Sequence, residues 1–592
     1  MIPQVKNNKQ EFFFNNLPLA DAANYEKVLW GFDALQSGAS ERSVAEALKI
    51  PKSTFHDQIK PLKSGAISRT SYAFFNSDDG QEFLSRLLFG LLFWMITPKS
   101  SSIESLSAAL KFAGIGAFRP ISYGSLFALK SELETTFLIT CKEEKQRMMR
   151  GTRLLYATIV MDETWLDGMY LVAIDAVSGL TLLEKMSDQR TAEAWENALR
   201  LENPDLEIVF IQATSDEAAA LINFAKKRIG GNHSPDLFHI LNEICKGLSL
   251  PLHNAQKRAS NEIESLIAEH REIESVLLEN VEHLDVVSVT KDAVAVKEVG
   301  EPTPYNVIEG VRCRAEALEP TAASSIELAC NHLEECMDNL DEAVTSLNEI
   351  RQTTETFHEC LKDFSRLYHP VSLTTGIPRN PSKVKQKIYA IFGKLENCAT
   401  IFRSEKIDKH LRKAKKVGNA MQETLEFVHN LVQKEVAKYG LSYSQQKQVT
   451  MRLIPAAYLD RVALQAKTTQ ERTRLQEIAK QRREKALESG VFAELSQHKL
   501  DDILKLSKDL SGVFQRSSSC VEGRNGMLSQ KFHSSRGFSA HQVEKFTYWG
   551  NFVTRRADNS TAAERFCGMK QRDICKMTFE RLNEMPYRRA AG

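Results

Sequence analysis

The stretch "LLYATIVMDETWLDGMYLVAIDAVSGLTLLEKM", residues 154–186, marks a change from helical to strand-like patterning along the chain. Apolar and β-branched residues follow one another here in short runs, which are partly alternating with polar residues. Two glycine-containing segments, 166–168 and 177–179, interrupt the runs. Runs of this composition between turn residues are typical of β-strands. The stretch therefore predicts three consecutive antiparallel strands.

The residues that follow continue this pattern with a helix and a fourth strand. An amphipathic helix is predicted at 192–201, and "LEIVFIQATSDEAAALINFAKKR", residues 206–228, combines a buried strand with a helix directly after it. Three antiparallel strands, a helix, and then a strand with its helix is the element order of a ribonuclease H-like core. We therefore expect the catalytic part of the chain to lie here.

The remainder of the chain has helical patterning, with long mixed-charge helices from 247 to 510. We predict an α/β ribonuclease H-like core that is interrupted by a large all-α insertion and preceded by an all-α region. Five domains are expected: a helix-turn-helix domain at 1–65, a helical scaffold at 66–150, the first part of the core at 151–246, the helical insertion at 247–510, and the last part of the core with a basic tail at 511–592.

Residues 40–60, "SERSVAEALKIPKSTFHDQIK", have the spacing of a DNA-binding helix-turn-helix. Apolar side chains at helical spacing predict the inner faces of two helices and the turn between them: Val44, Ala45, Leu48, Ile50, Phe55 and Ile59. The second helix would present four polar side chains to a major groove: Lys52, Thr54, His56 and Gln58. Lys49 stands where such turns often carry glycine, and a plain three-helix core is the alternative interpretation.

Composition excludes some classes of protein. The 77 basic and 76 acidic side chains nearly cancel, so only local charge bears on a nucleic-acid partner. The ten cysteines, spread from Cys141 to Cys575, form no CxxC pair, which favours reduced thiols over disulfides or structural zinc. The sequence shows no signal peptide and no apolar run long enough to cross a membrane. We expect a soluble intracellular protein.

Two aspartates stand at the predicted ends of strands. Asp162 follows the apolar run of the first strand in "IVMDETW", and Asp216 comes just after the fourth strand in "QATSDEAA". The first and fourth strands are neighbours in a ribonuclease H-like sheet, so we expect the two carboxylates to meet at its edge. Because two close carboxylates repel each other, a divalent cation between them is favourable.

Hard carboxylate oxygens favour Mg²⁺ or Mn²⁺, and two such ions about 3.5–4 Å apart can catalyse phosphoryl transfer. A third carboxylate is needed for the second ion. Glu522, in "SSSCVEGRNGMLSQKFHSSRGFS" at 517–539, is the best-placed candidate because it stands among basic residues. We predict that Asp162, Asp216 and Glu522 are catalytic and hold two Mg²⁺ or Mn²⁺ ions. Nearby cations would bind DNA: Arg524, Lys531 and Arg536.

Each of these assignments has an alternative. Asp162 could cap a turn while Glu163 or Asp175 serves as the ligand. Asp216 could be the N-cap of the Ala-rich helix that follows it, and Glu217 could be the true ligand one position further on.

Taken together, these features resemble a bacterial insertion-sequence transposase of the DDE class. A helix-turn-helix, a split ribonuclease H-like core and a large helical insertion before the last acid also occur in hAT-type transposases. Those families carry a C/D-x-x-H motif after the second aspartate, and this chain has "DLFH", Asp236 to His239, at the corresponding place. The chain departs from the pattern in spacing, since 306 residues separate Asp216 from Glu522.

The resemblance implies an enzyme that cleaves and joins DNA strands at the ends of its own mobile element. Asp236 and His239 would support the active site, although a structural histidine is the competing account. The implied partners are double-stranded DNA, as terminal repeats and target, and further copies of the chain in a homodimer or higher oligomer, in a bacterial cytoplasm at the nucleoid. Two alternatives stay open: an inactive or domesticated DNA-binding relative, and a nuclease on the same fold that cuts without joining.

Overall fold

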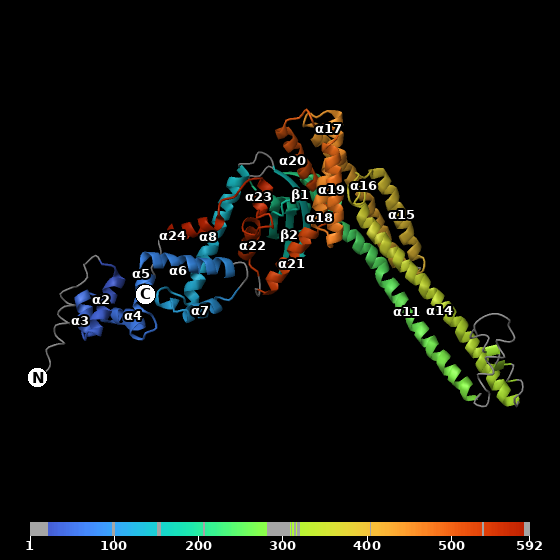
Figure 1. Ribbon diagram of the computed structural model, residues 1–592, viewed down its shortest axis with the longest axis horizontal. Coiled ribbons are helices and arrows are strands. Elements are labelled where there is room, and N and C mark those ends of the chain that lie inside the picture. Colours follow the sequence, from blue (N-terminus) through green and yellow to red (C-terminus); the bar gives the residue numbers. More distant parts are fainter. Residues whose placement is uncertain are drawn as a thin grey trace. The chain divides into compact units, whose positions relative to one another are not determined.

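The computed structural model describes residues 22–96, 101–150, 155–204, 208–280, 308–309, 311–312, 315, 320–402, 404–534 and 538–584. These residues are mostly helical, with one mixed five-stranded sheet (Figure 1). The chain divides into two compact units, residues 1–209 with 520–592 and residues 210–519. In sequence, the second unit therefore stands between two parts of the first. The five predicted domains stay predictions, and the compact units divide at other positions than 246 and 510.

The first unit begins with three helices that share a small core: α2 (Asn24–Gln36), α3 (Glu41–Leu48) and α4 (Lys52–Lys63). Ser40 caps α3 by accepting a hydrogen bond from the backbone N–H of Ser43 at 3.1 Å. Lys49 ends α3 in the left-handed region with φ 55°, the conformation that glycine usually supplies. The predicted inner-face residues are buried, except Ile50, which is partly buried against the same core. The two helices thus form where the sequence predicted them.

More helices of the first unit follow before the sheet: α5 (Arg69–Asn76), α6 (Asp78–Leu91), η1 (Leu92–Ile96), α7 (Ile103–Phe112), η2 (Ile115–Ala117) and α8 (Tyr123–Arg150). Ser residues cap three of the helices by accepting a backbone hydrogen bond from the first turn: Ser68, Ser77 and Ser102. Aromatic side chains from α6, η1 and α8 pack together around Phe93, which is fully buried.

The sheet has the strand order β3-β2-β1-β4-β5. Its strands are β1 (Leu155–Trp165), β2 (Met169–Asp175), β3 (Thr181–Met186), β4 (Ile208–Ser215) and β5 (Asn232–Pro235), with α9 (Ala192–Glu202) between β3 and β4. β1 to β3 form an antiparallel meander in which Asp162 lies opposite Val172, whereas β4 and β5 are parallel. Three strands, two turns, a helix and a fourth strand therefore lie where the sequence predicted them.

One detail of β1 differs from the prediction. Asp162 does not end the strand, because β1 runs on to Trp165 and pairs there with Met169 of β2. Glu163, Thr164 and Trp165 continue the strand because they pair across the hairpin as far as its turn at 166–168. Asp162 consequently lies within the antiparallel ladder, three residues before its end.

The last part of the first unit covers one face of the meander. It contains α21 (Ser519–Ser534), α22 (Ala540–Phe552), α23 (Ala562–Cys567) and α24 (Ile574–Glu584). A buried cluster joins β1 and β2 to α21, α22 and the segment between them: Val160, Tyr170, Val172, Ile174, Val521, Leu528, Phe538 and Val543. Residues more than 340 positions apart in sequence are thereby packed into one apolar core.

The second unit contains the long helices α11 (Leu237–Asn280) and α14 (Pro320–Leu367), which run side by side (Figure 1). The other helices are α10 (Ala219–Asn223), η3 (Phe224–Arg228), α15 (Pro381–Ala399), α16 (Glu405–Ala437), α17 (Tyr443–Gln448), η4 (Val449–Leu453), α18 (Ile454–Leu464), α19 (Thr469–Leu487) and α20 (Gln497–Val513). Apolar residues from α11, α14, α15, α16, α18 and α19 form its main core. Within the described part of the chain, no helix is long and apolar enough to cross a membrane.

Candidate active site

The Asp162 carboxylate lies beside the second turn of α21. Asn525 donates a hydrogen bond from its Nδ2 to Asp162 Oδ2 at 2.7 Å, although the two residues are 363 positions apart. Side chains two residues apart in a strand share a face, and Val160 on the same face of β1 packs in the cluster that contains α21. The fold therefore holds α21 against the face of β1 that carries Asp162.

Glu522 lies on the first turn of α21, three residues before Asn525. Residues three positions apart are neighbours on a helix surface. The Glu522 side chain is exposed, and Asp162 is partly buried. Glu522 therefore lies one helical turn before Asn525, the residue of α21 that contacts Asp162.

Asp216 follows Ser215, the last residue of β4. Its Oδ1 accepts a hydrogen bond from the backbone N–H of Ala218 at 3.0 Å, which closes the turn before α10. Ala218 itself is the N-cap of α10, so the alternative that Asp216 caps this helix is wrong. Behind the turn, His233 Nε2 lies 3.0 Å from Ser215 Oγ. Burial, followed by the charge of Lys226, lowers the pKa of His233 to about 4, so this ring is neutral at pH 7.

Glu217, the alternative to Asp216, has cationic neighbours. Desolvation and then the charge of Asp216 raise the pKa of Glu217, and three lysines oppose this rise: Lys226, Lys416 and Lys413. Lys226 belongs to η3, and the other two belong to α16, which packs against β5. Acidic and basic side chains therefore lie close together at this end of β4.

Asp236 is buried at the start of α11, and His239, whose side chain is 36% exposed, lies beside it. Asp236 is 1% exposed, and its Oδ1 accepts hydrogen bonds from the backbone N–H groups of Phe238 at 2.9 Å and Ser518 at 3.2 Å. Ser518 Oγ donates to its Oδ2, from which His239 Nε2 lies 3.7 Å away. These contacts tie the start of α11 to the segment that precedes α21 in sequence. They suit a structural support rather than a metal ligand, because protein donors surround the carboxylate.

The two other acids near β1 are held in different ways. Asp175 is 2% exposed, and it accepts hydrogen bonds from the Thr158 and Ser178 N–H groups at 2.9 and 2.8 Å and from Ser178 Oγ at 2.6 Å. It therefore stabilises the turn between β2 and β3. Glu163 Oε2 lies 3.3 Å from Arg190 Nε. Neither arrangement favours the alternative that one of these acids replaces Asp162.

No group of three or more His, Cys, Asp or Glu side chains that could hold a metal ion occurs among the residues that the structure describes. The donor chemistry of the three predicted acids suits Mg²⁺ or Mn²⁺, since all supply hard oxygen atoms.

We predicted that Arg524 contacts DNA, but its side chain is buried in the first unit. Its guanidinium donates two hydrogen bonds to Glu184 of β3 at 2.6 and 2.5 Å and lies 4.0 Å from the centre of the Phe546 ring. Both charged side chains are less than a tenth exposed. This bidentate pair attaches α21 to β3, so Arg524 leaves the set of expected DNA contacts.

The other predicted DNA contacts differ in accessibility. Lys531 is partly buried, and desolvation followed by the charges of Lys545 and Lys130 lowers its pKa. Arg536 lies outside the described residues. On α4, the side chains of Lys52, Thr54 and His56 are exposed and Gln58 is partly buried. His56 Nδ1 lies 3.0 Å from Glu41 Oε2 of α3, so this side chain links the two helices.

Sequence reasoning missed Asn525 and Glu184. The spacing Glu-x-x-Asn on one helix would have indicated a shared surface, but its partner Asp162 is hundreds of residues away in sequence. Glu184 shares one face of β3 with Leu182 and Met186, because side chains two residues apart in a strand point the same way. Only the fold shows that Arg524 meets it there.

Comparison with known proteins places part of the chain in context. Residues 449–591 match the model of a family of unknown function, DUF6399. The matched segment starts in η4 and includes α21 with Glu522 and Asn525. A search among curated proteins finds no match for this chain. The family match therefore attaches no activity to these residues.

Proposed function

We propose that this chain is a DDE-type transposase, a metal-dependent enzyme that cleaves DNA at the ends of a mobile element and joins the ends to target DNA. The observation that carries the proposal is the hydrogen bond from Asn525 to Asp162 at 2.7 Å. It shows that the helix with the last predicted acid returns to the strand with the first one. A DDE enzyme with an insertion before its last acid requires this return.

The arrangement of the strands gives further support. A ribonuclease H-like core has an antiparallel meander of three strands followed by parallel strands, in the order 3-2-1-4-5. The meander β1 to β3, the parallel pair β4 and β5, and the sheet order agree with this architecture. We propose the ribonuclease H-like fold on these grounds.

The proposed metal ligands are Asp162, Asp216 and Glu522. Bound Mg²⁺ or Mn²⁺ ions would activate the attacking oxygen and stabilise the leaving oxygen of a phosphodiester. The chain itself supplies the orientation of the acids. The uncharged amide of Asn525 holds one oxygen of Asp162 through a hydrogen bond. The buried pair of Arg524 and Glu184 fixes the first turns of α21, on which Glu522 stands.

Two regions supply candidate DNA contacts. In the first unit, α4 exposes Lys52 and Thr54 at its amino-terminal end, where a recognition helix contacts base edges. In the second unit, Lys226 and Lys416 are exposed near Glu217 and Asp216. Cations at this position would bind phosphate groups of the strand to be cut. The proposal includes a homodimer or higher oligomer on DNA, acting in the cytoplasm at the nucleoid.

The test is a cleavage and joining assay with purified full-length protein, Mg²⁺ or Mn²⁺, and labelled DNA from both flanks of the coding region. We expect nicked or cut flank DNA and joined products, both abolished by EDTA. Cut DNA without joined products would support a nuclease instead of a transposase. Binding without cutting, in the presence of either metal, would support the inactive DNA-binding relative and overturn the proposal.

A further inference from the structure

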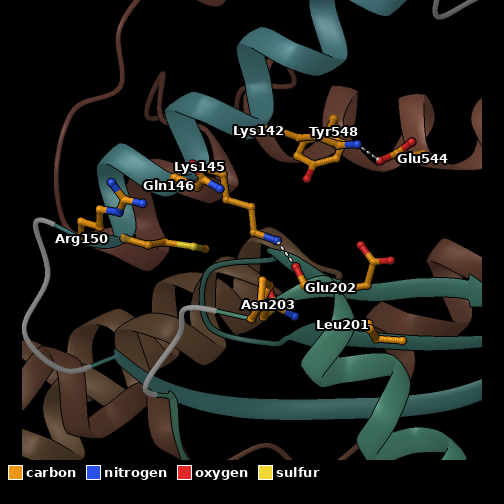
Figure 2. A pocket seen from close by; sticks show the side chains of 11 residues that line it. Lys142, Lys145, Gln146, Arg150, Leu201, Glu202, Asn203, Glu544 and Tyr548 are labelled. Carbon is orange, nitrogen blue, oxygen red and sulfur yellow. Dashed lines mark hydrogen bonds and ion pairs between the residues drawn. The ribbon is translucent and has the colours of Figure 1, made fainter.

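A pocket of about 270 Å³ lies in the first unit between α8, the end of α9 and α22 (Figure 2). Its α8 wall consists of residues at helical spacing, which therefore share one face of that helix: Lys142, Lys145, Gln146, Met149 and Arg150. The other walls come from Leu201, Glu202, Asn203 and Pro204 after and within α9, and from Glu544 and Tyr548 of α22. None of these residues has a part in the proposed DNA chemistry.

The charges of the pocket are unevenly paired. Three cations and two carboxylates line it. Each carboxylate has a lysine partner, because Glu544 lies 2.6 Å from Lys142 Nζ and Glu202 lies 3.4 Å from Lys185 Nζ. The charges of Glu202 and Glu544 also act on Lys145, whereas no ion pair joins Arg150 to a carboxylate among the described residues. The pocket therefore has an excess of positive charge.

Lys145 is the central cation of the pocket. Figure 2 shows its side chain reaching from α8 to the end of α9, where Nζ donates a hydrogen bond to the backbone carbonyl oxygen of Glu202 at 2.9 Å. A cation at a helix carboxyl end is favourable, and this contact accounts for one of the three N–H donors of an ammonium group. Burial is the main cause that lowers the pKa of Lys145, and the charges of Glu202 and Glu544 oppose it, as an anionic ligand would do further.

The remaining lining suits a flat, partly apolar group. Met149 and Tyr548 are buried and contribute apolar surface, and Pro204 adds more. A second pocket of about 320 Å³, between β3 and α22, shares four lining residues with the first: Lys145, Glu202, Glu544 and Tyr548. Ligand sites of small molecules have volumes of about 300–1,000 Å³, so the two adjoining pockets offer enough room for a nucleotide.

We propose that this pocket binds a nucleotide, with the phosphate monoester on Lys145 and Arg150 and the ring system against Met149 and Tyr548. A phosphate monoester carries up to two negative charges at neutral pH, and the lining has three cations against two carboxylates to receive it. The ligand chemistry is the same for a free nucleoside monophosphate and for a 5′-phosphorylated end of a DNA strand. This inference goes beyond the proposed function, because it requires neither metal ions nor strand cleavage.

The test is calorimetric titration of the full-length protein without divalent metal, using deoxyadenosine monophosphate, deoxyadenosine and inorganic phosphate as probes. We expect the monophosphate to bind at least about tenfold more tightly than either other probe, since each lacks one half of the recognised group. Arg150→Gln and Lys145→Gln should each weaken its binding by about tenfold. Arg200→Gln is the matched control: it removes a charge from α9 that lies outside the pocket, pairs with Glu196 at 2.7 Å and is 76% exposed.

Two oligonucleotides, one with a 5′-phosphate and one with a 5′-hydroxyl group, show whether the bound phosphate belongs to a DNA end or to a free nucleotide. Tighter binding of the phosphorylated strand, lost in Arg150→Gln, assigns the pocket to DNA ends, whereas equal binding assigns it to free nucleotides. Lys145→Gln removes the hydrogen bond to the end of α9, so the thermal unfolding of this variant is compared with that of the unaltered protein. Arg150 is exposed, and Arg150→Gln therefore leaves that hydrogen bond intact. The proposal is overturned if the three small probes bind equally or not at all, or if Arg150→Gln binds the monophosphate like the unaltered protein.

Discussion

Two aspartates of the same antiparallel meander have opposite surroundings. Asp175, at the end of β2, is 2% exposed and accepts hydrogen bonds from two backbone N–H groups and a hydroxyl. Asp162, within β1, is partly exposed and accepts a hydrogen bond from the Asn525 side chain. Backbone donors that surround a carboxylate use it to hold a turn, whereas a side-chain amide orients a carboxylate and leaves it accessible. The difference predicts that one acid serves stability and the other serves chemistry.

The largest expected effect is on catalysis. Replacing Asp162, Asp216 or Glu522 by Ala should lower the rate of metal-dependent strand cleavage by more than about a thousandfold, because each removes a proposed metal ligand. DNA binding, measured by fluorescence anisotropy, should change little, since phosphate contacts come from basic side chains. An Asp162→Ala variant that cleaves at the normal rate would remove this residue from the site. If Glu217→Ala lost cleavage activity and Asp216→Ala kept it, the metal ligand would be Glu217 instead of Asp216.

The buried pair that anchors α21 should have the largest effect on stability. Arg524→Ala leaves the Glu184 carboxylate buried without its guanidinium partner, and it should lower the free energy of unfolding by about 3–5 kcal/mol. Chemical denaturation checks this value. The control is Arg190→Ala, which removes an exposed partner of Glu163. Similar stabilities of the two variants would show that the pair does not hold α21 in place.

A smaller loss of stability should follow from changing Asp175. Asp175→Asn keeps the size of the side chain but turns an amide donor toward groups that already donate, and should cost about 2 kcal/mol. Cleavage by the folded fraction should stay near the rate of the unaltered protein. Normal stability together with lost cleavage would reverse the roles that the comparison gives to Asp162 and Asp175.

Glu144 of α8 should make a pH-dependent contribution of similar or smaller size to the free energy of unfolding. Burial by itself raises the pKa of Glu144, but hydrogen bonds from Arg147 and Arg572 outweigh it and lower the pKa from 4.5 to about 2. Because the folded-state pKa lies below the unfolded one, this stabilisation is complete above about pH 4.5 and is lost as the pH falls toward 2. Glu144→Gln should therefore show a weaker loss of stability across this range than the unaltered protein. Parallel acid-unfolding curves would contradict the assignment.

The smallest effect concerns DNA affinity. Lys52→Ala on α4 should weaken binding to flank DNA several-fold and reduce the slope of affinity against salt by about one if the side chain contacts a phosphate. His56→Ala is the comparison, since His56 already contacts Glu41. A larger loss of affinity from His56→Ala than from Lys52→Ala would show that the exposed end of α4 is not the DNA-binding surface.

Local patterns of the sequence predicted the local structure. Alternating residues with glycine-containing turns at 166–168 and 177–179 located β1 to β3, and the spacing of Val44, Leu48 and Phe55 located two helices. The end of β1 was misplaced because cross-strand pairing, which no single strand reveals, extends it to Trp165.

Long-range partners were not predictable in this way. Arg524 resembled a DNA contact because its neighbours in sequence are basic, yet Glu184, 340 positions earlier, neutralises it within the fold. Asn525 was missed for the same reason, since its role depends on β1. Charge in a sequence window does not show which charges are already paired.

The central claim is that Asp162, Asp216 and Glu522 hold the same metal ions, and iron-directed cleavage of the protein tests it most directly. Fe²⁺ in place of Mg²⁺, with ascorbate and peroxide, produces hydroxyl radicals that cut the backbone next to the bound metal. We predict cuts beside all three acids, suppressed by excess Mg²⁺ and lost together in Glu522→Gln. Cuts beside Asp162 that persist in Glu522→Gln, or no cuts beside any of the three, would contradict the claim.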